Sequence, residues 1–516
     1  MWRKSGLNMH HEAMCDIGVF GLGVMGAALA RNIAGRGFAV AAYSVDDAER
    51  ERFRAGMRFG PKMSPNLSGD AGAEPGAGAQ SASTQGAGAQ SAGAGAAPAG
   101  SFVVADTLDG FVGSLSAPRR ILLMVTAGQA VDQVLDRLLP LLAPGDAVMD
   151  GGNSWYEDTE RRVALAGGHG VHYMGVGVSG GERGALEGPS ITAGGDREAW
   201  AICADILEAI AAKADGLPCC RYVGPGGAGH YVKMVHNGIE YGIMQVIAEA
   251  WLLMDSLPGL TGEGEAADCF NRWRTGKLSS YLIDAATAVL SKADDDGEPL
   301  VDRILDVAEQ NGTGRWAVLE AMERGVYAPT ISVASSMRSL SARPELRHRG
   351  HKTLAVTPCH MGQSARPVRE EDLEDAVYAA ILCCFSQGLE LLVAASDQFG
   401  WKIDLHDVVS AWKAGCIIRA ELLHRIEHAL HDAYEGNLLL SAEFSPLSEE
   451  AALRRIAIDA AASGLYAPAF YASLSYYDAC RAGRMPLNLI QGMRNHFGAH
   501  RFRRTDRDGL FDINWE

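Results

Sequence analysis

The feature of this sequence that most limits its possible folds is a glycine-rich turn between a strand and a helix. Asp16–Phe20 is a short apolar run typical of a buried strand, Gly21–Gly26 reads GLGVMG, and an alanine-rich helix is expected to about Arg36. In this setting the glycines permit a tight turn and let a pyrophosphate approach the helix N-terminus. The pattern predicts a dinucleotide-binding α/β domain.

Strand and helix patterns continue to alternate after this turn. Four further apolar runs alternate with amphipathic segments: Ala39–Tyr43, Ile121–Val125, Ala147–Asp150 and Val171–Met174. Such alternation predicts a parallel, doubly wound sheet. The alternation is interrupted at about 68–100 by Ala, Gly, Ser and Gln, with GAGAQSA at 76 and again at 86. Because this segment has little apolar bulk to offset its ordering entropy, we expect a disordered insertion that activity does not need.

The second half of the chain is a succession of helical patterns. Long amphipathic runs include Val377–Phe399 and Ile417–Tyr434. We therefore predict a Rossmann-type domain over 1–226, a large all-α domain for substrate binding and dimerisation over 227–483, and a C-terminal tail over 484–516.

One helix, predicted from Gly229 to beyond Glu249, carries an unusual polar stripe. Spacings of three and four residues place five different polar side chains on one face: Lys233, His236, Asn237, Glu240 and Tyr241. A solvated face is the alternative, but such faces are usually rich in Glu and Lys, and the rest of this helix is apolar or small. The stripe therefore indicates the lining of a wet pocket.

Lys233 and Glu240 lie two turns apart on this stripe and suit proton transfer. Burial lowers the pKa of a lysine and raises that of a glutamate, which gives a base and an acid near neutral pH.

Residues 227–245, GAGHYVKMVHNGIEYGIMQ, resemble the active-site helix of the 6-phosphogluconate dehydrogenase family. Three other segments resemble the same family: DGGNS at 150–154, GVSGGERGA at 177–185 and NGTGRW at 311–316. The resemblance implies oxidative decarboxylation of 6-phospho-D-gluconate to D-ribulose 5-phosphate in the pentose phosphate pathway. The expected cofactor is NADP, with NAD as the alternative, and no metal is expected.

The resemblance also implies roles for individual residues. Lys233 and Glu240 are the expected catalytic base and acid. The expected substrate-binding residues are Asn153, Ser179, Gly180, Gly181, His236, Asn237, Tyr241, Thr313, Arg338, Arg494 and His500. The expected cofactor-binding residues are Gly21, Leu22, Gly23, Val24, Met25, Gly26, Ser44, Val45, Asp46, Val125, Thr126, Ala127 and Asn153.

The chain departs from the family pattern at several of these positions. Ser44-Val45-Asp46 stand where NADP-dependent members carry Asn-Arg-Thr, and three arginines on the next helix are the cations available as replacements: Arg50, Arg52 and Arg54. Asp46 and Asp47 would repel a 2′-phosphate. Lysines of the family are replaced by Thr126 and Asn311, and a glutamate by Arg183. Arg315 is the nearest cation to compensate at Asn311.

Residues 488–500, NLIQGMRNHFGAH, resemble the family tail that enters the neighbouring subunit. The resemblance implies a homodimer with shared active sites, to which Arg494 and His500 of one chain contribute in the other.

Charge and composition limit the possible binding partners and the expected compartment. A formal net charge of −17 disfavours a nucleic-acid or anionic-membrane binder. The ten cysteines lack CxxC spacing, which disfavours a zinc site or a disulfide framework and indicates a reducing compartment. The start lacks an apolar leader, so we expect a cytoplasmic protein.

Two other functions remain open from the sequence. The loss of lysine at Asn311 favours a related β-hydroxyacid dehydrogenase acting on an unphosphorylated acid, whereas the retained tail disfavours it. The departures at Val45, Thr126, Arg183 and Asn311 suggest a non-catalytic paralogue, but the proton-transfer residues are retained.

Overall fold

A computed structural model describes residues 14–57, 100–257, 259–260, 265–310, 312–354, 367–431, 436–445 and 447–515. Nearly all of the low-complexity segment predicted at 68–100, and Asn311, lie outside these ranges. The chain forms two compact units, the first comprising Met1–Glu240, Ser279–Leu282 and Leu389–Ala433, and the second comprising Tyr241–Leu278, Ile283–Gly388 and Tyr434–Glu516.

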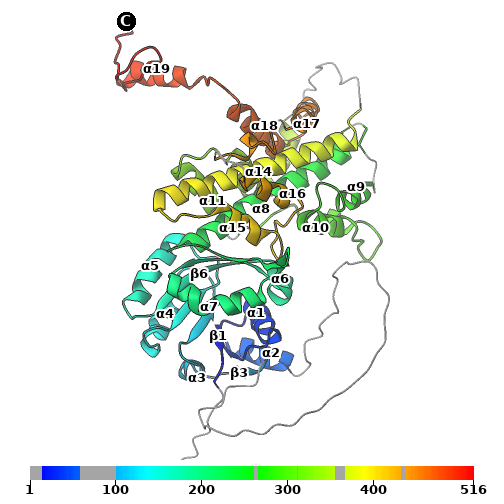
Figure 1. The fold of residues 1–516 in the computed structure, drawn as a ribbon. Helices are drawn as coiled ribbons and strands as arrows, with labels where there is room; N and C mark the ends of the chain where they lie inside the picture. Colours follow the sequence, from blue (N-terminus) through cyan, green and yellow to red (C-terminus); the bar gives the residue numbers. More distant parts are fainter. Residues whose placement is uncertain are drawn as a thin grey trace, which may run out of the picture. The chain divides into compact units, whose positions relative to one another are not determined.

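The first unit is built on an eight-stranded sheet (Figure 1). Its order is β10-β7-β6-β5-β4-β1-β2-β3. The strands are β1 Ile17–Phe20, β2 Val40–Tyr43, β3 Phe102–Val104, β4 Arg120–Leu123, β5 Ala147–Asp150, β6 His172–Ser179, β7 Ser190–Gly195 and β10 Cys220–Gly224. A separate short pair joins β8 Lys213–Ala214 to β9 Leu217–Pro218.

Six neighbouring strands, from β3 to β6, run parallel. Five of them were predicted to do so, and the short strand β3 was not predicted. The far edge of the sheet was not predicted from the sequence, and there β7 runs antiparallel to β6 and β10 runs parallel to β7. The physical reason is the connection after β6, where a single short helix, α6 Gly181–Glu187, leads the chain back beside the strand it has just left. A parallel partner would need a longer crossover.

Helices bury both faces of the sheet, so it is doubly wound, as predicted. Side chains alternate along each strand: Ile17 and Val19 enter one core, and Phe20 enters the other. The first core also includes residues of α1 Val24–Gly35, α2 Asp47–Met57, α6 and α7 Arg197–Ile210. The second includes residues of α3 Leu108–Gly113, α4 Gln129–Leu138 and α5 Tyr156–Gly167.

The chain after β10 is helical, as predicted. Its α-helices are α8 Ala228–Ser256, α9 Glu265–Trp273, α10 Tyr281–Leu290, α11 Thr313–Glu323, α12 Pro329–Ser341, α13 Pro344–Thr353, α14 Glu370–Phe399, α15 Leu405–Trp412, α16 Leu422–His431, α17 Glu450–Ala462, α18 Pro468–Cys480 and α19 Leu487–Gly498. The helix predicted at Gly229–Glu249 lies within α8, and that at Val377–Phe399 lies within α14.

The helix predicted from Ile417 begins five residues later than expected. Ala420 forms an isolated β-bridge with Ser280, and the backbone on either side of it bonds the same segment: Tyr281 N donates to Arg419 O at 3.1 Å, and Glu421 N donates to Ser279 O at 2.9 Å. These non-local bonds take the backbone groups that a helix would use.

In the part of the chain that the structure describes, one helix is both long and strongly apolar, α14. Its composition and length would allow it to cross a membrane, but 89% of its most apolar window is buried inside the protein. Such burial is typical of the core helix of a globular unit.

Candidate active site

The turn after β1 requires glycine at two positions. Gly21 has a φ of +100°, and a Cβ there would lie 2.4 Å from the Met124 carbonyl oxygen. At Gly26 a Cβ would lie 2.0 Å from the Gly21 carbonyl oxygen. No side chain caps the N-terminus of α1, where Gly23 is the N-cap. This geometry lets a backbone or phosphate group come close to the helix N-terminus.

The other expected residues of the turn differ in exposure. Leu22 is buried, Met25 is half-buried and Val24 is exposed.

The end of β2 is held by Glu49 of α2, a residue that the sequence analysis missed. The Ser44 hydroxyl donates to Glu49 Oε2 at 2.6 Å, and the Leu22 backbone N–H donates to the same oxygen at 3.2 Å. Asp46 accepts from the backbone N–H of Ala48 at 2.8 Å, as a residue at a helix start does. Glu49 was missed because its position on the helix gave no sign that it faces the glycine-rich turn.

The loops after β4 and β5 share one buried arginine, Arg162 of α5. Its guanidinium donates to Gly128 O at 2.9 Å, to Ser154 Oγ at 3.2 Å and to the Asp150 carboxylate at 3.5 Å. Asp150 also accepts from Ser154 Oγ at 2.6 Å and from Gly152 N at 3.0 Å. These bonds fix the two loops relative to each other. Sequence reasoning missed Arg162, because a charged residue on an amphipathic helix normally faces solvent.

The predicted ligand residues on these loops remain accessible. Asn153 and Thr126 are exposed, and Val125 and Ala127 are half-buried. The β5 loop therefore presents Asn153 outward while Asp150, beneath it, takes the structural hydrogen bonds.

The segment after β6 brings Ser179 beside α8. The Ser179 hydroxyl lies 3.1 Å from His236 Nε2. Gly180 has a φ of +124°, and a Cβ there would lie 2.4 Å from the Gly415 carbonyl oxygen. Arg183, which replaces the family glutamate, forms an ion pair with Glu187 on its own helix at 3.0 Å.

Gly181, at the start of α6, also has a positive φ, of +63°. The backbone conformation of this loop therefore favours glycine at Gly180 and at Gly181, the two glycines that the resemblance assigns to substrate binding.

The polar stripe of α8 forms a connected array. Lys233 Nζ donates to Asn237 Oδ1 at 2.9 Å, and the same oxygen lies 3.2 Å from His236 Nδ1. Glu240 Oε2 lies 3.7 Å from His236 Nδ1. On the other sides of this helix the residues predicted to need burial are buried, and Val232, Val235 and Val246 are fully enclosed, whereas Met244 is 41% exposed. Four of the predicted residues therefore lie together on one helix face.

Burial sets the proton affinity of this array. Lys233 is only 9% exposed, and desolvation lowers its pKa, an effect that the nearby Glu240 partly offsets. Burial also holds the pKa of His236 well below its usual value, and the charge of Lys233 acts in the same direction. A lysine in this position can exist as a neutral amine at a higher fraction than an exposed one, next to a neutral imidazole.

In the second unit, Arg338 and the start of α11 meet at the ring of Tyr241. The Arg338 guanidinium carbon lies 3.5 Å from the centroid of the Tyr241 ring, and Arg338 also donates to Glu309 O at 2.9 Å. A Cβ on Gly314 would lie 2.4 Å from the Tyr241 ring, so the start of α11, with buried Thr313, packs against it. A guanidinium, a hydroxyl and a helix N-terminus are groups suited to a phosphate.

The tail carries its own polar centre. Asn495 of α19 is buried and bonds Asp512 Oδ1 at 2.8 Å, the indole N–H of Trp515 at 2.8 Å and His500 O at 3.3 Å. Arg494 and His500, the residues predicted for the partner's site, are both exposed.

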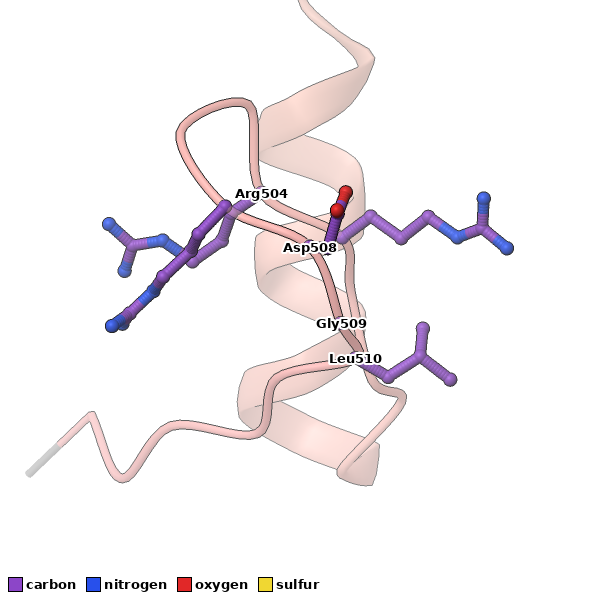
Figure 2. A pocket seen from close by; sticks show the side chains of 6 residues that line it. Arg504, Asp508, Gly509 and Leu510 are labelled. Atoms are coloured by element: carbon purple, nitrogen blue, oxygen red, sulfur yellow. The ribbon is translucent and has the colours of Figure 1, made fainter.

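After α19 the chain turns back, and Phe502 pairs with Phe511. A pocket of about 210 Å³ at this turn is lined by Arg503, Arg504, Arg507, Asp508, Gly509 and Leu510 (Figure 2).

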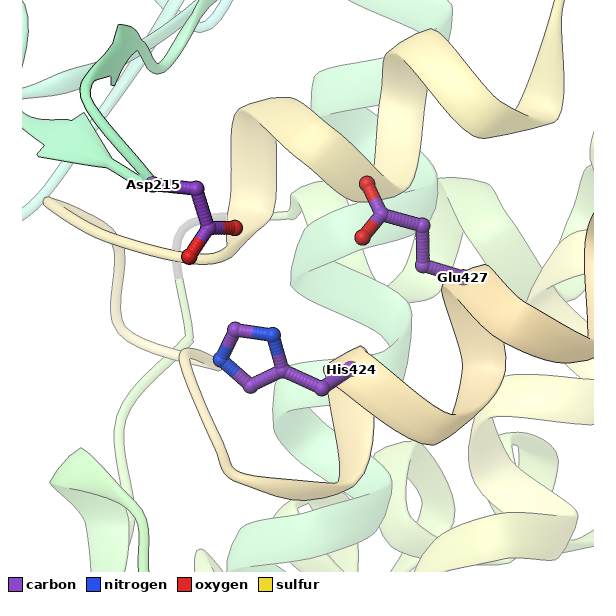
Figure 3. A group of neighbouring side chains, drawn as sticks. All are labelled: Asp215, His424 and Glu427. Carbon is purple, nitrogen blue, oxygen red and sulfur yellow. The ribbon is translucent and has the colours of Figure 1, made fainter.

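A second group of polar side chains lies in the first unit (Figure 3). Asp215, His424 and Glu427 place possible metal ligand atoms within 4.8 Å of one another. The ammonium of Lys413, however, pairs with Asp215 and lies 2.7 Å from Glu427 Oε2. Because this cation already pairs with both carboxylates, the group is an ion-pair network.

Two family models match the chain. "NAD binding domain of 6-phosphogluconate dehydrogenase" matches residues 16–72 and 78–224, and "6-phosphogluconate dehydrogenase, C-terminal domain" matches residues 229–515. The first ends just before α8, and the second includes the α8 array and the tail.

Two relatives and one solved structure are similar to this chain over nearly its whole length. A "6-phosphogluconate dehydrogenase, decarboxylating" from Synechococcus elongatus is 42% identical, covering 98% of this chain and 100% of its own. The NADP(+)-dependent enzyme of Bacillus subtilis is 40% identical, covering 97% and 99%. The Plasmodium falciparum 6-phosphogluconate dehydrogenase, solved in apo form and with NADP+ or 6-phosphogluconate, has a TM-score of 0.86 at 36% identity, covering 97% and 100%. This chain therefore belongs to the decarboxylating 6-phosphogluconate dehydrogenase family.

Proposed function

We propose that this chain oxidises and decarboxylates 6-phospho-D-gluconate, giving D-ribulose 5-phosphate and carbon dioxide with reduction of a nicotinamide adenine dinucleotide, in the pentose phosphate pathway. The observation that carries the proposal is the array of Lys233, His236, Asn237 and Glu240 on α8 in a chain of this family. Asn153, Ser179, His236 and Asn237 orient the sugar acid, and the two glycines after Ser179 let it approach the backbone.

Lys233 acts first as a base. Because burial lowers its pKa, its neutral amine can take the proton of the C3 hydroxyl. A bound nicotinamide supplies the acceptor for the C3 hydride. The product of oxidation is a β-keto acid, and the Lys233 ammonium donates a hydrogen bond to its C3 carbonyl oxygen.

Loss of carbon dioxide then leaves an enediol. The electron pair of the broken carbon–carbon bond moves toward the C3 carbonyl, where the Lys233 ammonium stabilises the developing negative charge. The Lys233 ammonium gives a proton to the C3 oxygen, which completes the enediol. Glu240 then donates a proton to the carbon that lost its carboxylate, while the neutral Lys233 amine takes the enol proton back from the C3 oxygen, so that this carbon becomes C1 of the pentulose and the C3 carbonyl becomes its ketone. Asn237 accepts from Lys233 and so holds the amine in place through both steps.

The substrate phosphate binds at Tyr241, Thr313 and Arg338, together with Arg494 and His500 from a second chain. The meeting of Arg338 and the start of α11 at the Tyr241 ring supports this assignment. Arg338→Gln is expected to raise the KM for 6-phosphogluconate roughly tenfold or more, because a charge-assisted hydrogen bond contributes about 1.5–3 kcal/mol.

The test of the catalytic assignment is Lys233→Ala, with Lys213→Ala, an exposed lysine of β8, as the control. Both variants should bind the dinucleotide. Lys233→Ala should lose both dinucleotide reduction and carbon dioxide release by about 10²–10⁴-fold, the range for a general base. Turnover within a few-fold of the unmodified enzyme would remove Lys233 as the base.

The functional unit is a homodimer in the cytoplasm. Large apolar side chains of α19 are exposed in the single chain, with Leu489 66% and Phe497 74% exposed, which supports a second copy as their partner. Mixing Lys233→Ala chains with Arg494→Gln chains tests the shared site. Each mixed dimer would hold one intact site, so activity should recover to roughly a quarter of the unmodified level. No recovery would mean that each site is made by one chain.

A further inference from the structure

The adenosine end of the dinucleotide site contains a fixed carboxylate. Glu49 Oε2 accepts from the backbone N–H of Leu22, in the glycine-rich turn, at 3.2 Å and from the hydroxyl of Ser44, at the end of β2, at 2.6 Å. Its other oxygen lies 3.5 Å from the place that a Cβ on Gly23 would take. The carboxylate therefore lies between the first turn and the second strand, where Rossmann domains bind the ribose of the adenosine.

The neighbouring cations of α2 are mostly engaged elsewhere. Arg50 donates to the Ser44 carbonyl and to the Asp47 carboxylate. Arg54 donates to Asp106 and, at 2.8 Å, to Glu51 Oε1. These two arginines already have acidic partners on the protein, and the third, Arg52, is exposed.

Val45, the residue that follows Ser44, supplies no charge at this end of the site. Val45 is 59% exposed and can make no ion pair. Asp46 and Asp47 follow it, so the segment after β2 adds negative charge beside Glu49. A 2′-phosphate at this position would meet a carboxylate where it needs a cation, whereas a 2′-hydroxyl could donate a hydrogen bond to it.

We propose that Glu49 makes this enzyme select NAD over NADP by accepting a hydrogen bond from the 2′-hydroxyl of the adenosine ribose. The inference rests on the proposed function only in that a nicotinamide adenine dinucleotide is the cofactor. The selection separates this chain from its NADP(+)-dependent relative in Bacillus subtilis. A hydrogen bond to a charged group contributes enough to give a preference of roughly 10- to 150-fold.

The experiment is a fluorescence titration of the full-length protein with NADH and with NADPH, without sugar substrate. NADH should bind at least about tenfold more tightly than NADPH. Glu49→Gln should remove most of this ratio, because the amide carries no negative charge. The matched control is Glu51→Gln, which changes the net charge equally on the same helix but removes a carboxylate paired with Arg54. This control should leave the ratio unchanged.

Val45→Arg provides an independent variant at an exposed position, where a long side chain can be accommodated. It should tighten NADPH binding more than NADH binding, so the ratio of the two affinities should move toward NADPH. Equal or tighter binding of NADPH by the unmodified protein would overturn the inference, as would a ratio that Glu49→Gln does not alter. Failure of both dinucleotides to bind would refute the proposed function as well. Tight NADH binding without turnover of 6-phosphogluconate would refute the proposed function alone.

Discussion

Glu249, a buried carboxyl that the proposed mechanism does not use, should make the stability of the protein depend on pH. It lies on α8 and accepts from the backbone N–H groups of Ala469 at 2.9 Å and Phe470 at 3.2 Å, in the first turn of α18. Gln245 donates to its other oxygen at 2.9 Å. The carboxyl therefore caps α18 from a distant part of the chain.

Burial raises the pKa of Glu249 from 4.5 to about 7, although these hydrogen bonds act in the opposite direction. The ionised form is therefore about 3 kcal/mol less stable in the folded protein than in the unfolded chain. Between pH 4.5 and 7 the folded protein binds more protons than the unfolded chain. This group consequently lowers the free energy of unfolding as the pH rises through that window. Above pH 7 its effect stays constant.

Glu249→Gln removes the titration and keeps an oxygen that can accept from α18. The free energy of unfolding of the variant, relative to that of the unmodified protein, should be about 2–3 kcal/mol higher at pH 8 than at pH 5. In scanning calorimetry, the Tm of the variant minus the Tm of the unmodified protein should be larger at pH 8 than at pH 5 by roughly 5–10 °C. Glu323→Gln, at an exposed position on α11, is the control. A Tm difference that is the same at both pH values would refute the raised pKa.

Two substitutions test other parts of the site. Arg162→Met should destabilise the protein by about 3–5 kcal/mol, because it leaves the buried Asp150 without its cation, whereas Arg161→Met, at an exposed pair, should cost less than about 1 kcal/mol by thermal unfolding. Gly177→Ala places a Cβ 2.6 Å from Lys233 Cβ, so it should cost about 1–3 kcal/mol and lower kcat; an unaltered kcat would show that α8 can shift freely.

The sequence determined the fold class and which polar residues share one face of α8. The order of apolar runs and glycines after β1 requires a strand, a tight turn and a helix, and the spacing along α8 places Lys233 and Asn237 on one face whatever surrounds them. These features are local, since they depend on residues at most two helix turns apart. Five of the six parallel strands followed from the same alternation of patterns, whereas β3 was not predicted.

The tertiary structure decided which polar groups support the site. Glu49 and Arg162 lie on helices whose patterns read as ordinary amphipathic surfaces, and only the packing of α2 and α5 against the loops turns them inward. The direction of β7 and the late start of α16 also depend on partners distant in sequence. Contacts of this kind set burial, and burial sets the pKa values of Lys233 and Glu249, because desolvation depends on every neighbour and not on the residue itself.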